Sequence, residues 1–314
     1  MSPQMRSVLC LLLAMMLVLI CLSACSTSES PPPEPQVQSF DAGDGPYGIC
    51  FDGENVWVAN YWSDTVTKIS TSNGEIMGSF VIGRAPRDVC FDGENIWVTQ
   101  HLSDTVTKLR ASDGEILGAF AVGHYPEGIC FDGESIWVAN HEDDNVAKLR
   151  ASDGEVLGTF AAGDAPQGMY FDGQYVWVAS PSDGTVFKLR PSDGQTIDIF
   201  SLGKHTSPFK LCSDGENNIW VTNAGRDTVT KLRASDGEVL GIFGVGDAPH
   251  GLCFDGENIW VVNDWSDDVT KLRASDGEVL GTFEVGDYPQ SACFDGKNIW
   301  VANAWGDSVT KIRP

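Results

Sequence analysis

Positive charge is scarce in this sequence. Its 314 residues include 20 Lys and Arg side chains against 44 Asp and Glu side chains, and the formal net charge is −24 at pH 7. A surface this acidic repels phosphate backbones and anionic headgroups. We therefore expect no nucleic-acid partner.

The sequence also lacks the short motifs of several familiar sites. It contains no GxSxG nucleophile signature, and the DxDxDG spacing of a calcium-binding EF-hand loop does not occur. The motifs therefore point to no cofactor, and only a divalent metal held by residues far apart in the chain is left open.

Long apolar runs are absent apart from one near the start, Val8 to Leu22. This run is short for a hydrocarbon core of about 30 Å, although an uncleaved membrane helix remains the alternative. The following tetrapeptide LSAC, Leu22 to Cys25, resembles the lipobox of bacterial lipoproteins. That resemblance implies a signal peptide over residues 1–24, a lipid on Cys25 and an extracytoplasmic place in a bacterial cell envelope. Residues 25–36, rich in Pro, then suit an extended tether.

The rest of the sequence is a repeat. Seven Trp residues recur at intervals of 40 residues, with one interval of 43, and they are Trp57, Trp97, Trp137, Trp177, Trp220, Trp260 and Trp300. Each unit holds four short β-type segments, and Asp-Gly pairs separate the first two and the last two of them. Four-stranded units repeated at about 40 residues are the signature of β-propeller blades. Residues 37–314 are therefore predicted to form an all-β, seven-bladed propeller.

The two ends of this region are complementary. The last unit has only three strands before Pro314, and the stretch QVQSFDAG from Gln36 supplies an isolated fourth strand. We expect this N-terminal strand to complete the last blade, so that Phe40 lies near Lys311 and no strand edge stays unpaired.

The units resemble a known group of propellers. The stretch IWVTNAGRDTVTKLRASDGEVLGIFGVGDAPHGLCFDG, Ile219 to Gly256, looks like the YVTN and NHL type propellers and, more distantly, streptogramin B lyase. The lyase resemblance implies a divalent metal with His and Glu residues on one face, and an acid at the end of the second strand. This sequence departs from the last feature, because the matching positions are Asn60, Gln100, Asn140, Ser180, Asn223, Asn263 and Asn303.

Residues that recur in every blade are explained by the blade. We expect the seven Trp side chains to form the core. Six Cys residues share one first-strand position, and we interpret them as small buried residues without disulfides: Cys50, Cys90, Cys130, Cys212, Cys253 and Cys293. Acids before the third strand, such as Asp104, are expected to accept backbone N–H bonds within their own turn. The third-strand lysines, such as Lys108, are interpreted as a solvated blade edge.

The blades differ mainly in the loops from strand four to strand one and from strand two to strand three. Antiparallel strands place both sets of loops on one face of the ring, here called the top face. All five histidines fall there. His101, His124 and His141, with Glu142 and Glu127 near, are candidates for a metal site or an acid–base set. The alternative is that they are exposed loop histidines without a ligand.

Two further sets of residues mark the top face as a binding surface. Trp62, Trp265 and Trp305 occupy the loops after strand two in blades one, six and seven, and are predicted to form an aromatic platform or, alternatively, to shield blade junctions. The basic residue Arg84 lies in a neighbouring loop. The residue after each interblade Pro should point to the channel mouth, and these residues are Tyr47, Arg87, Glu127, Gln167, Phe209, His250 and Gln290.

Variation at one equivalent position of the ring is what a recognition site at the channel mouth would need. The sequence therefore favours a monomeric binding module whose top face takes a small molecule, a glycan or an exported protein. A metal-dependent lyase similar to streptogramin B lyase and a structural envelope scaffold are the alternatives.

Overall fold

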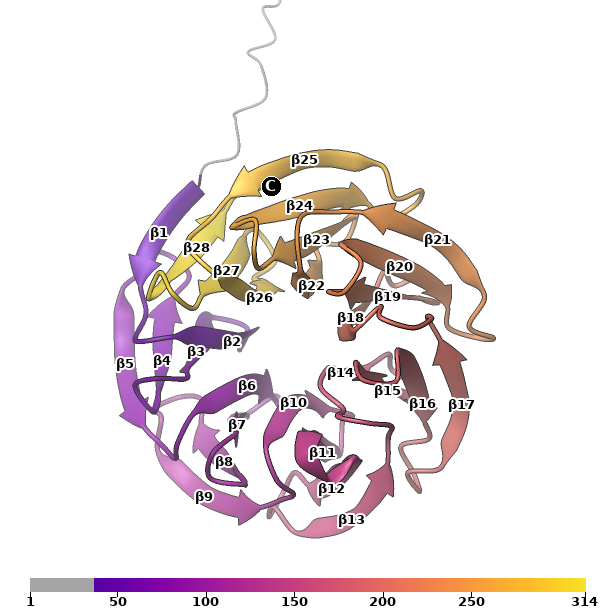
Figure 1. Ribbon diagram of the computed structural model, residues 1–314. Coiled ribbons are helices and arrows are strands. Elements are labelled where there is room, and N and C mark those ends of the chain that lie inside the picture. Colours follow the sequence, from indigo (N-terminus) through magenta and orange to yellow (C-terminus); the bar gives the residue numbers. More distant parts are fainter. Residues whose placement is uncertain (1–36) are drawn as a thin grey trace, which may run out of the picture. The chain divides into compact units, whose positions relative to one another are not determined.

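The computed structural model describes residues 37–314, which form seven four-stranded antiparallel sheets arranged as the blades of a ring (Figure 1). The predicted all-β seven-bladed propeller is therefore confirmed. The expected signal peptide, the tether and Cys25 lie outside the described residues. Within residues 37–314, no helix is both long and apolar enough to cross a membrane.

Blades 1 to 6 each follow the chain from the innermost to the outermost strand. Blades 1 to 3 consist of β2 (Pro46–Phe51), β3 (Asn55–Asn60), β4 (Thr65–Ser70), β5 (Ile76–Val81), β6 (Pro86–Phe91), β7 (Asn95–Gln100), β8 (Thr105–Arg110), β9 (Ile116–Ala121), β10 (Pro126–Phe131), β11 (Ser135–Asn140), β12 (Asn145–Arg150) and β13 (Val156–Ala161), with a short 3-10 helix η1 (His141–Asp143) after β11. Blades 4 to 6 consist of β14 (Met169–Phe171), β15 (Val176–Ser180), β16 (Thr185–Leu189), β17 (Thr196–Ser201), β18 (Pro208–Ser213), β19 (Asn218–Asn223), β20 (Thr228–Arg233), β21 (Val239–Gly244), β22 (Pro249–Phe254), β23 (Asn258–Asn263), β24 (Asp268–Arg273) and β25 (Val279–Glu284).

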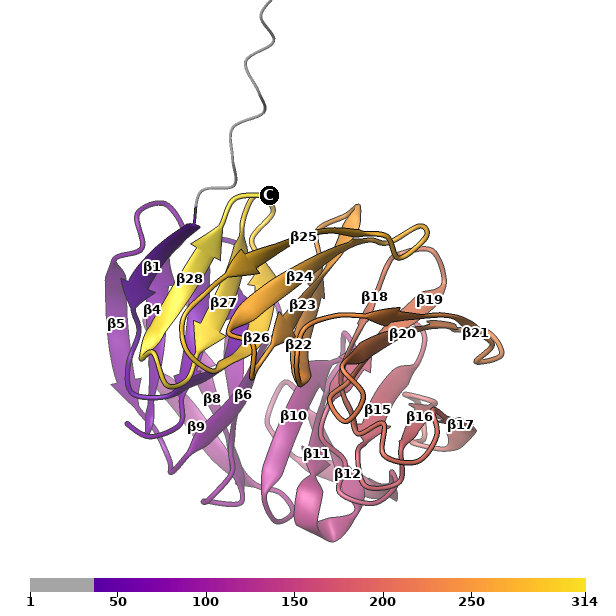
Figure 2. The same ribbon diagram turned by 45° about the horizontal axis from the view of Figure 1, so that its top comes forward.

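Blade 7 closes the ring with strands from both ends of the described chain. It consists of β26 (Pro289–Phe294), β27 (Ile299–Asn303), β28 (Ser308–Ile312) and, outermost, β1 (Val37–Asp41). β1 lies beside β28 in both views (Figures 1 and 2), and the antiparallel register pairs Gln38 with Lys311 and Phe40 with Val309. The predicted closure is confirmed.

Each blade carries one fully buried Trp, as expected, and its contacts repeat around the ring. In blade 3, Trp137 has no exposed surface and packs 5.6 Å, centroid to centroid, from Phe160 of the outermost strand. Its indole Nε1–H donates to Oδ2 of Asp132 at 2.7 Å, and Asp132 belongs to the first Asp-Gly pair of the blade. One turn motif thus both reverses the chain and satisfies the buried indole donor.

The predictions for the repeated cysteines and for the repeated lysines have different outcomes. The six cysteines of residues 37–314 are free, as expected, but only half of them are buried: Cys130, Cys212 and Cys253 are buried, and Cys50, Cys90 and Cys293 are partly exposed. The expectation of solvated lysines was wrong: Lys108 is 8% exposed, lies 5.1 Å from the Trp97 ring centroid and donates to the carbonyl of Ala151 in the next blade at 2.7 Å. Five further third-strand lysines make the same kind of bond to a neighbouring blade. These lysines therefore join the blades.

The acids before the third strand also act between blades. Asp104 adopts a positive φ of 53°, and its Oδ1 accepts the backbone N–H of Tyr125, which lies in the loop leading to the next blade. The expectation of a bond within the acid's own turn was therefore wrong, because the donor lies in the loop that leads to the next blade. The same bond joins Asp307 to the backbone N–H of Gly45 at 3.0 Å and adds a second link between the last and first blades.

Candidate functional site

Neighbouring innermost strands approach one another closely where they begin, next to the interblade Pro residues. Each of them begins at or just after an interblade Pro, and small residues follow in most blades. At Gly128 a Cβ atom would lie 2.0 Å from the carbonyl oxygen of Gln167, and at Gly168 it would lie 1.9 Å from the carbonyl oxygen of Phe209. Only glycine therefore allows this approach of neighbouring blades.

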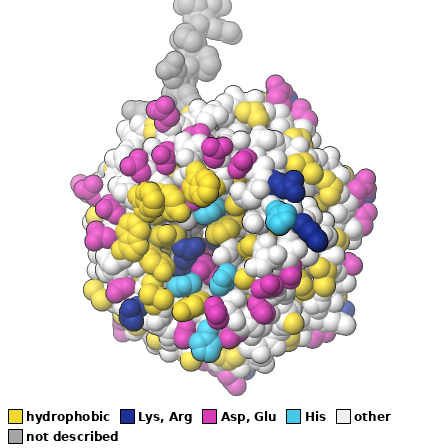
Figure 3. Space-filling view, viewed as in Figure 1, with side chains coloured by type: hydrophobic (Ala, Val, Ile, Leu, Met, Phe, Trp, Pro, Cys, Tyr) yellow, Lys and Arg dark blue, Asp and Glu magenta, His cyan; other side chains and the backbone are white. Residues whose placement is uncertain are grey.

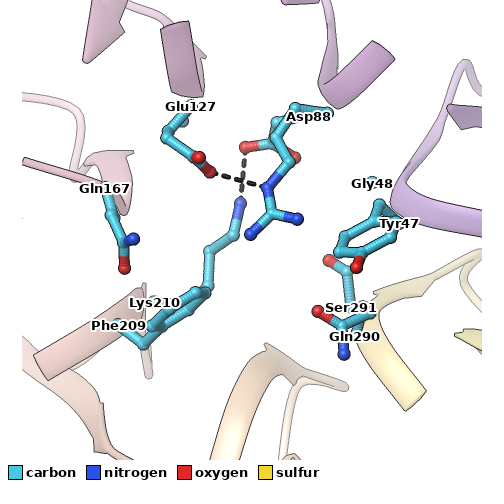
Figure 4. A pocket seen from close by; sticks show the side chains of 11 residues that line it. Tyr47, Gly48, Asp88, Glu127, Gln167, Phe209, Lys210, Gln290 and Ser291 are labelled. Atoms are coloured by element: carbon cyan, nitrogen blue, oxygen red, sulfur yellow. Dashed lines mark hydrogen bonds and ion pairs between the residues drawn. The ribbon is translucent and has the colours of Figure 1, made fainter. Parts of the chain in front are cut away.

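The residues after the interblade Pro surround the channel mouth (Figure 4). Six of the seven predicted mouth residues line a small cavity there, and they are Tyr47, Arg87, Glu127, Gln167, Phe209 and Gln290. The seventh, His250, lies at the side, where its ring stacks on Phe209 at 4.2 Å between centroids with an interplanar angle of 2°. The structure thus brings the whole predicted set together.

Arg87 and Glu127 form the central ion pair of the mouth. Arg87 Nε donates to Glu127 Oε2 at 2.6 Å. Burial alone favours the neutral acid, but the positive charge of Arg87 and the nearby His101 ring outweigh it and hold the pKa of Glu127 at about 2. The Arg87 guanidinium also lies 4.3 Å from the ring centroid of Tyr47 and 5.9 Å from that of Tyr61. Glu127 is therefore a fixed negative charge.

A second ion pair, which the sequence analysis did not predict, crosses the channel. Lys210 Nζ lies 2.5 Å from Asp88 Oδ2, although the two residues are 122 positions apart (Figure 4). The sequence nevertheless carries a signal for this pair at the position one residue after each mouth residue. Four blades have Gly at this position, and the other three have Asp88, Lys210 and Ser291. The cavity at the mouth has a volume of about 30 Å³. This is room for one or two water molecules, so a larger ligand must sit above the pair.

The side chains of the three candidate histidines have different neighbours. His101 Nδ1 is 3.0 Å from Glu127 Oε1, and its ring stacks on Tyr125 at 4.7 Å. His124 is exposed and pairs with Asp143 at 2.9 Å, a contact that raises the pKa of its imidazole. His141 lies in η1 with a buried Nδ1 that no described residue bonds, and Glu142 beside it is exposed. Within residues 37–314, no group of three His, Cys, Asp or Glu side chains could hold a metal ion.

A buried acid on blade 6 is a functional candidate that sequence reasoning missed. Asp264 is 1% exposed, and its Oδ1 accepts a hydrogen bond from Gln290 Nε2 at 2.8 Å. Burial raises the pKa of Asp264 to about 7 and lowers the pKa of the adjacent His250 to about 4. Asp264 occupies the place directly after strand two that holds His101 and His141 in blades 2 and 3, and that comparison could have found it.

The exposed tryptophans lie on neighbouring blades but do not form one cluster. Trp265 and Trp305 are 73% and 61% exposed, and Trp305 stacks on Tyr288 at 4.3 Å with an interplanar angle of 7°. Trp62 is 50% exposed and packs instead against Gly45 in the preceding loop. Arg84 is exposed on the rim. Figure 3 shows the resulting face, with hydrophobic side chains gathered on one side of a central hollow that contains charged and His side chains.

The amides at the end of the second strand belong to the framework. Asn60 Nδ2 donates to Thr67 Oγ1 at 2.8 Å, and Asn223, Asn263 and Asn303 make the equivalent bond in their blades. These side chains have almost no exposed surface. At these positions, where the lyase resemblance implies an acid, the chain therefore uses neutral amides that hold strands two and three together.

Comparisons with known proteins identify the fold. Virginiamycin B lyase from Staphylococcus aureus is 17% identical, covers 90% of this chain and 100% of its own, and superposes with a TM-score of 0.79. A second lyase structure, a streptogramin B lyase, is also 17% identical, with 89% and 97% covered and a TM-score of 0.77.

A protein of different chemistry is equally similar. Kuenenia stuttgartiensis hydrazine synthase is 17% identical, with 92% and 98% covered and a TM-score of 0.79. No protein-family model matches the chain, and no curated protein matches it. At this identity the likeness shows a shared seven-bladed propeller and does not assign an activity.

Proposed function

We propose that the protein is a binding module that recognises its ligand at the channel mouth on the top face. The observation that carries this proposal is the Arg87 side chain. Among the described residues, Arg87 donates one hydrogen bond from Nε and lies against two aromatic faces. The two terminal amino groups of the guanidinium are left to bind a carboxylate or carbonyl oxygen from above.

The surroundings of Arg87 favour a ligand that combines such an oxygen with a ring. Tyr47 and Tyr61 lie 5.1 Å apart between centroids and border the guanidinium. On the opposite side, the Phe209 and His250 rings offer a second aromatic edge. An aromatic acid, an acidic sugar or a peptide segment with an aromatic side chain has this chemistry, in line with a small molecule, glycan or exported protein as partner.

The test is a titration with benzoate as the first probe, in which NMR and thermal unfolding detect binding. We expect benzoate to bind the wild type and to lose about tenfold in affinity in Arg87→Met, since a charged hydrogen bond contributes about 1.5–3 kcal/mol. Arg110→Met, which changes an exposed Arg paired with Asp113 at 2.8 Å, is the matched control and should bind as the wild type does. Equal binding by the wild type and Arg87→Met would contradict the proposal.

A lyase is the second candidate function, because the S. aureus and streptogramin lyases share the fold and because His101 contacts Glu127 at the mouth. The test is incubation with quinupristin, which is present in one structure of a catalytically inactive virginiamycin B lyase of the same fold. Ring opening would be followed by chromatography with and without added Mg²⁺. Opening no faster than in buffer alone would remove this candidate.

We also propose that the propeller is a monomer held on the outside of a bacterial membrane by a lipid on Cys25. The lipobox-like LSAC segment and the Pro-rich residues 25–36 support this anchor. The test is metabolic labelling with a fatty acid in cells that express the full chain. Label and membrane fractionation should both be lost in Cys25→Ser, and a labelled Cys25→Ser variant would refute the anchor.

A further inference from the structure

A pocket of about 360 Å³ lies beside the channel mouth, over blades 6 and 7. Its lining consists of three aromatic and three acidic residues: Asp264, Trp265, Asp267, Asp287, Tyr288 and Trp305. No Lys, Arg or His lines it. The stacked pair of Tyr288 and Trp305 gives it one flat aromatic wall, and Trp265 is the most exposed Trp of residues 37–314.

We propose that this pocket binds an organic cation, an ammonium group carrying methyl or other alkyl substituents. This inference rests on the proposed function, because it names the charge of one part of a top-face ligand. Aromatic faces and carboxylates both attract positive charge, and alkylated ammonium groups lose little hydration when they leave water for an aromatic wall. The net charge of −24 adds a long-range attraction for cations.

An unpartnered atom independently points to a ligand here. Asp264 Oδ2 is buried and forms no hydrogen bond within the described residues, and the nearest basic atom, His250 Nδ1, is 3.5 Å away. A buried carboxylate oxygen without a partner is costly, and the positive charge of a cation in the pocket that Asp264 lines would offset part of that cost. Blade 6 alone has an acid at this place, since the equivalent residues are Tyr61, His101, His141, Pro181, Ala224 and Ala304.

Other occupants fit the pocket less well. The three carboxylates do not form a cluster that could hold a metal ion. An anion would meet the like charges of Asp267 and Asp287. A neutral sugar could stack on Trp305, but it would offer no charge to offset Asp267 and Asp287.

The experiment compares choline with its uncharged analogue 3,3-dimethyl-1-butanol, which has the same shape. Binding to the full chain would be measured by tryptophan fluorescence and by NMR at low ionic strength. We expect choline to bind at least about fivefold more tightly than the alcohol, and added salt to weaken it.

Variants localise the effect. Trp305→Ala and Asp287→Asn should each weaken choline binding by about threefold or more. The matched controls come from equivalent places in other blades: Leu102→Ala in the loop after β7, and Asp164→Asn in the loop before β14, should leave choline binding unchanged. These four side chains are in surface loops, so their replacement should not prevent folding.

Three results would overturn the inference: tighter binding of the uncharged alcohol, absence of choline binding, or equal loss in the controls. The outcome is separable from that of the proposed function. If choline fails while benzoate binding still depends on Arg87, the channel-mouth site stands and only the cation site is wrong. If benzoate fails while choline binds through Trp305, the ligand is recognised by the pocket alone.

Discussion

Buried and exposed tryptophans divide this molecule into two regions. The seven Trp residues of the second strands have no exposed surface, and every one donates its indole N–H to an Asp of its own blade. Trp62, Trp265 and Trp305 are at least half exposed and lie on three neighbouring blades. One residue type therefore builds the framework where it repeats and lies exposed on the surface where it does not.

The largest expected effect tests the framework. Trp137→Ala should lower the free energy of unfolding by about 3–5 kcal/mol, because it leaves a cavity and removes the donor to Asp132 Oδ2. Trp305→Ala, the surface counterpart, should change it by less than about 0.5 kcal/mol. Chemical denaturation measures both, and similar losses in the two variants would break the division.

The next effect concerns the buried acid at the boundary between the regions. The pKa of Asp264 is raised to about 7, so the unfolded chain releases this proton near pH 4 and the folded chain only near pH 7. Folded stability from this group is therefore fully present below pH 4 and is lost as the pH rises to about 7. Asp264→Asn should lie close to the wild type near pH 4.5 and exceed it at pH 8 by on the order of 4 kcal/mol, because a shift of about three pKa units corresponds to about 1.4 kcal/mol per unit.

Denaturation of both proteins across this pH range measures the difference. The groups that face Asp264 are His250 and Gln290 from the innermost strands, Tyr288 from the next loop, Asp267 from its own loop, and Arg87 at the mouth. These remain in both proteins, so their own titration largely cancels in the comparison. A constant difference from pH 4.5 to 8 would contradict the raised pKa.

The smallest expected effect concerns the hydrogen bonds that join neighbouring blades. Lys108→Met should cost about 1–2 kcal/mol, because it removes a hydrogen bond to the next blade and a cation over Trp97. Arg110→Met, two residues further along the same strand but exposed, should cost less. If the two variants have the same unfolding temperature, the third-strand lysines do not join the blades.

The repeat was readable from the sequence because it depends on local chemistry. The spacing of the buried Trp residues, the Asp-Gly turns and the lone strand before Pro46 predict seven blades and their closure. The mouth residues were also readable, since equivalent positions in a ring must face the same channel. Lys108 was misread because an isolated strand does not show that a neighbouring blade covers its edge.

The sequence by itself determined the number of blades, the closing strand and the ring position at which the blades differ, since each follows from a repeat of about 40 residues. The tertiary structure alone decided which of the differing side chains meet. Asp88 and Lys210 pair across 122 residues, and the buried Asp264 contacts Gln290 and His250, which lie on other strands. Pairing and burial depend on distances around a closed ring, and no local pattern encodes them.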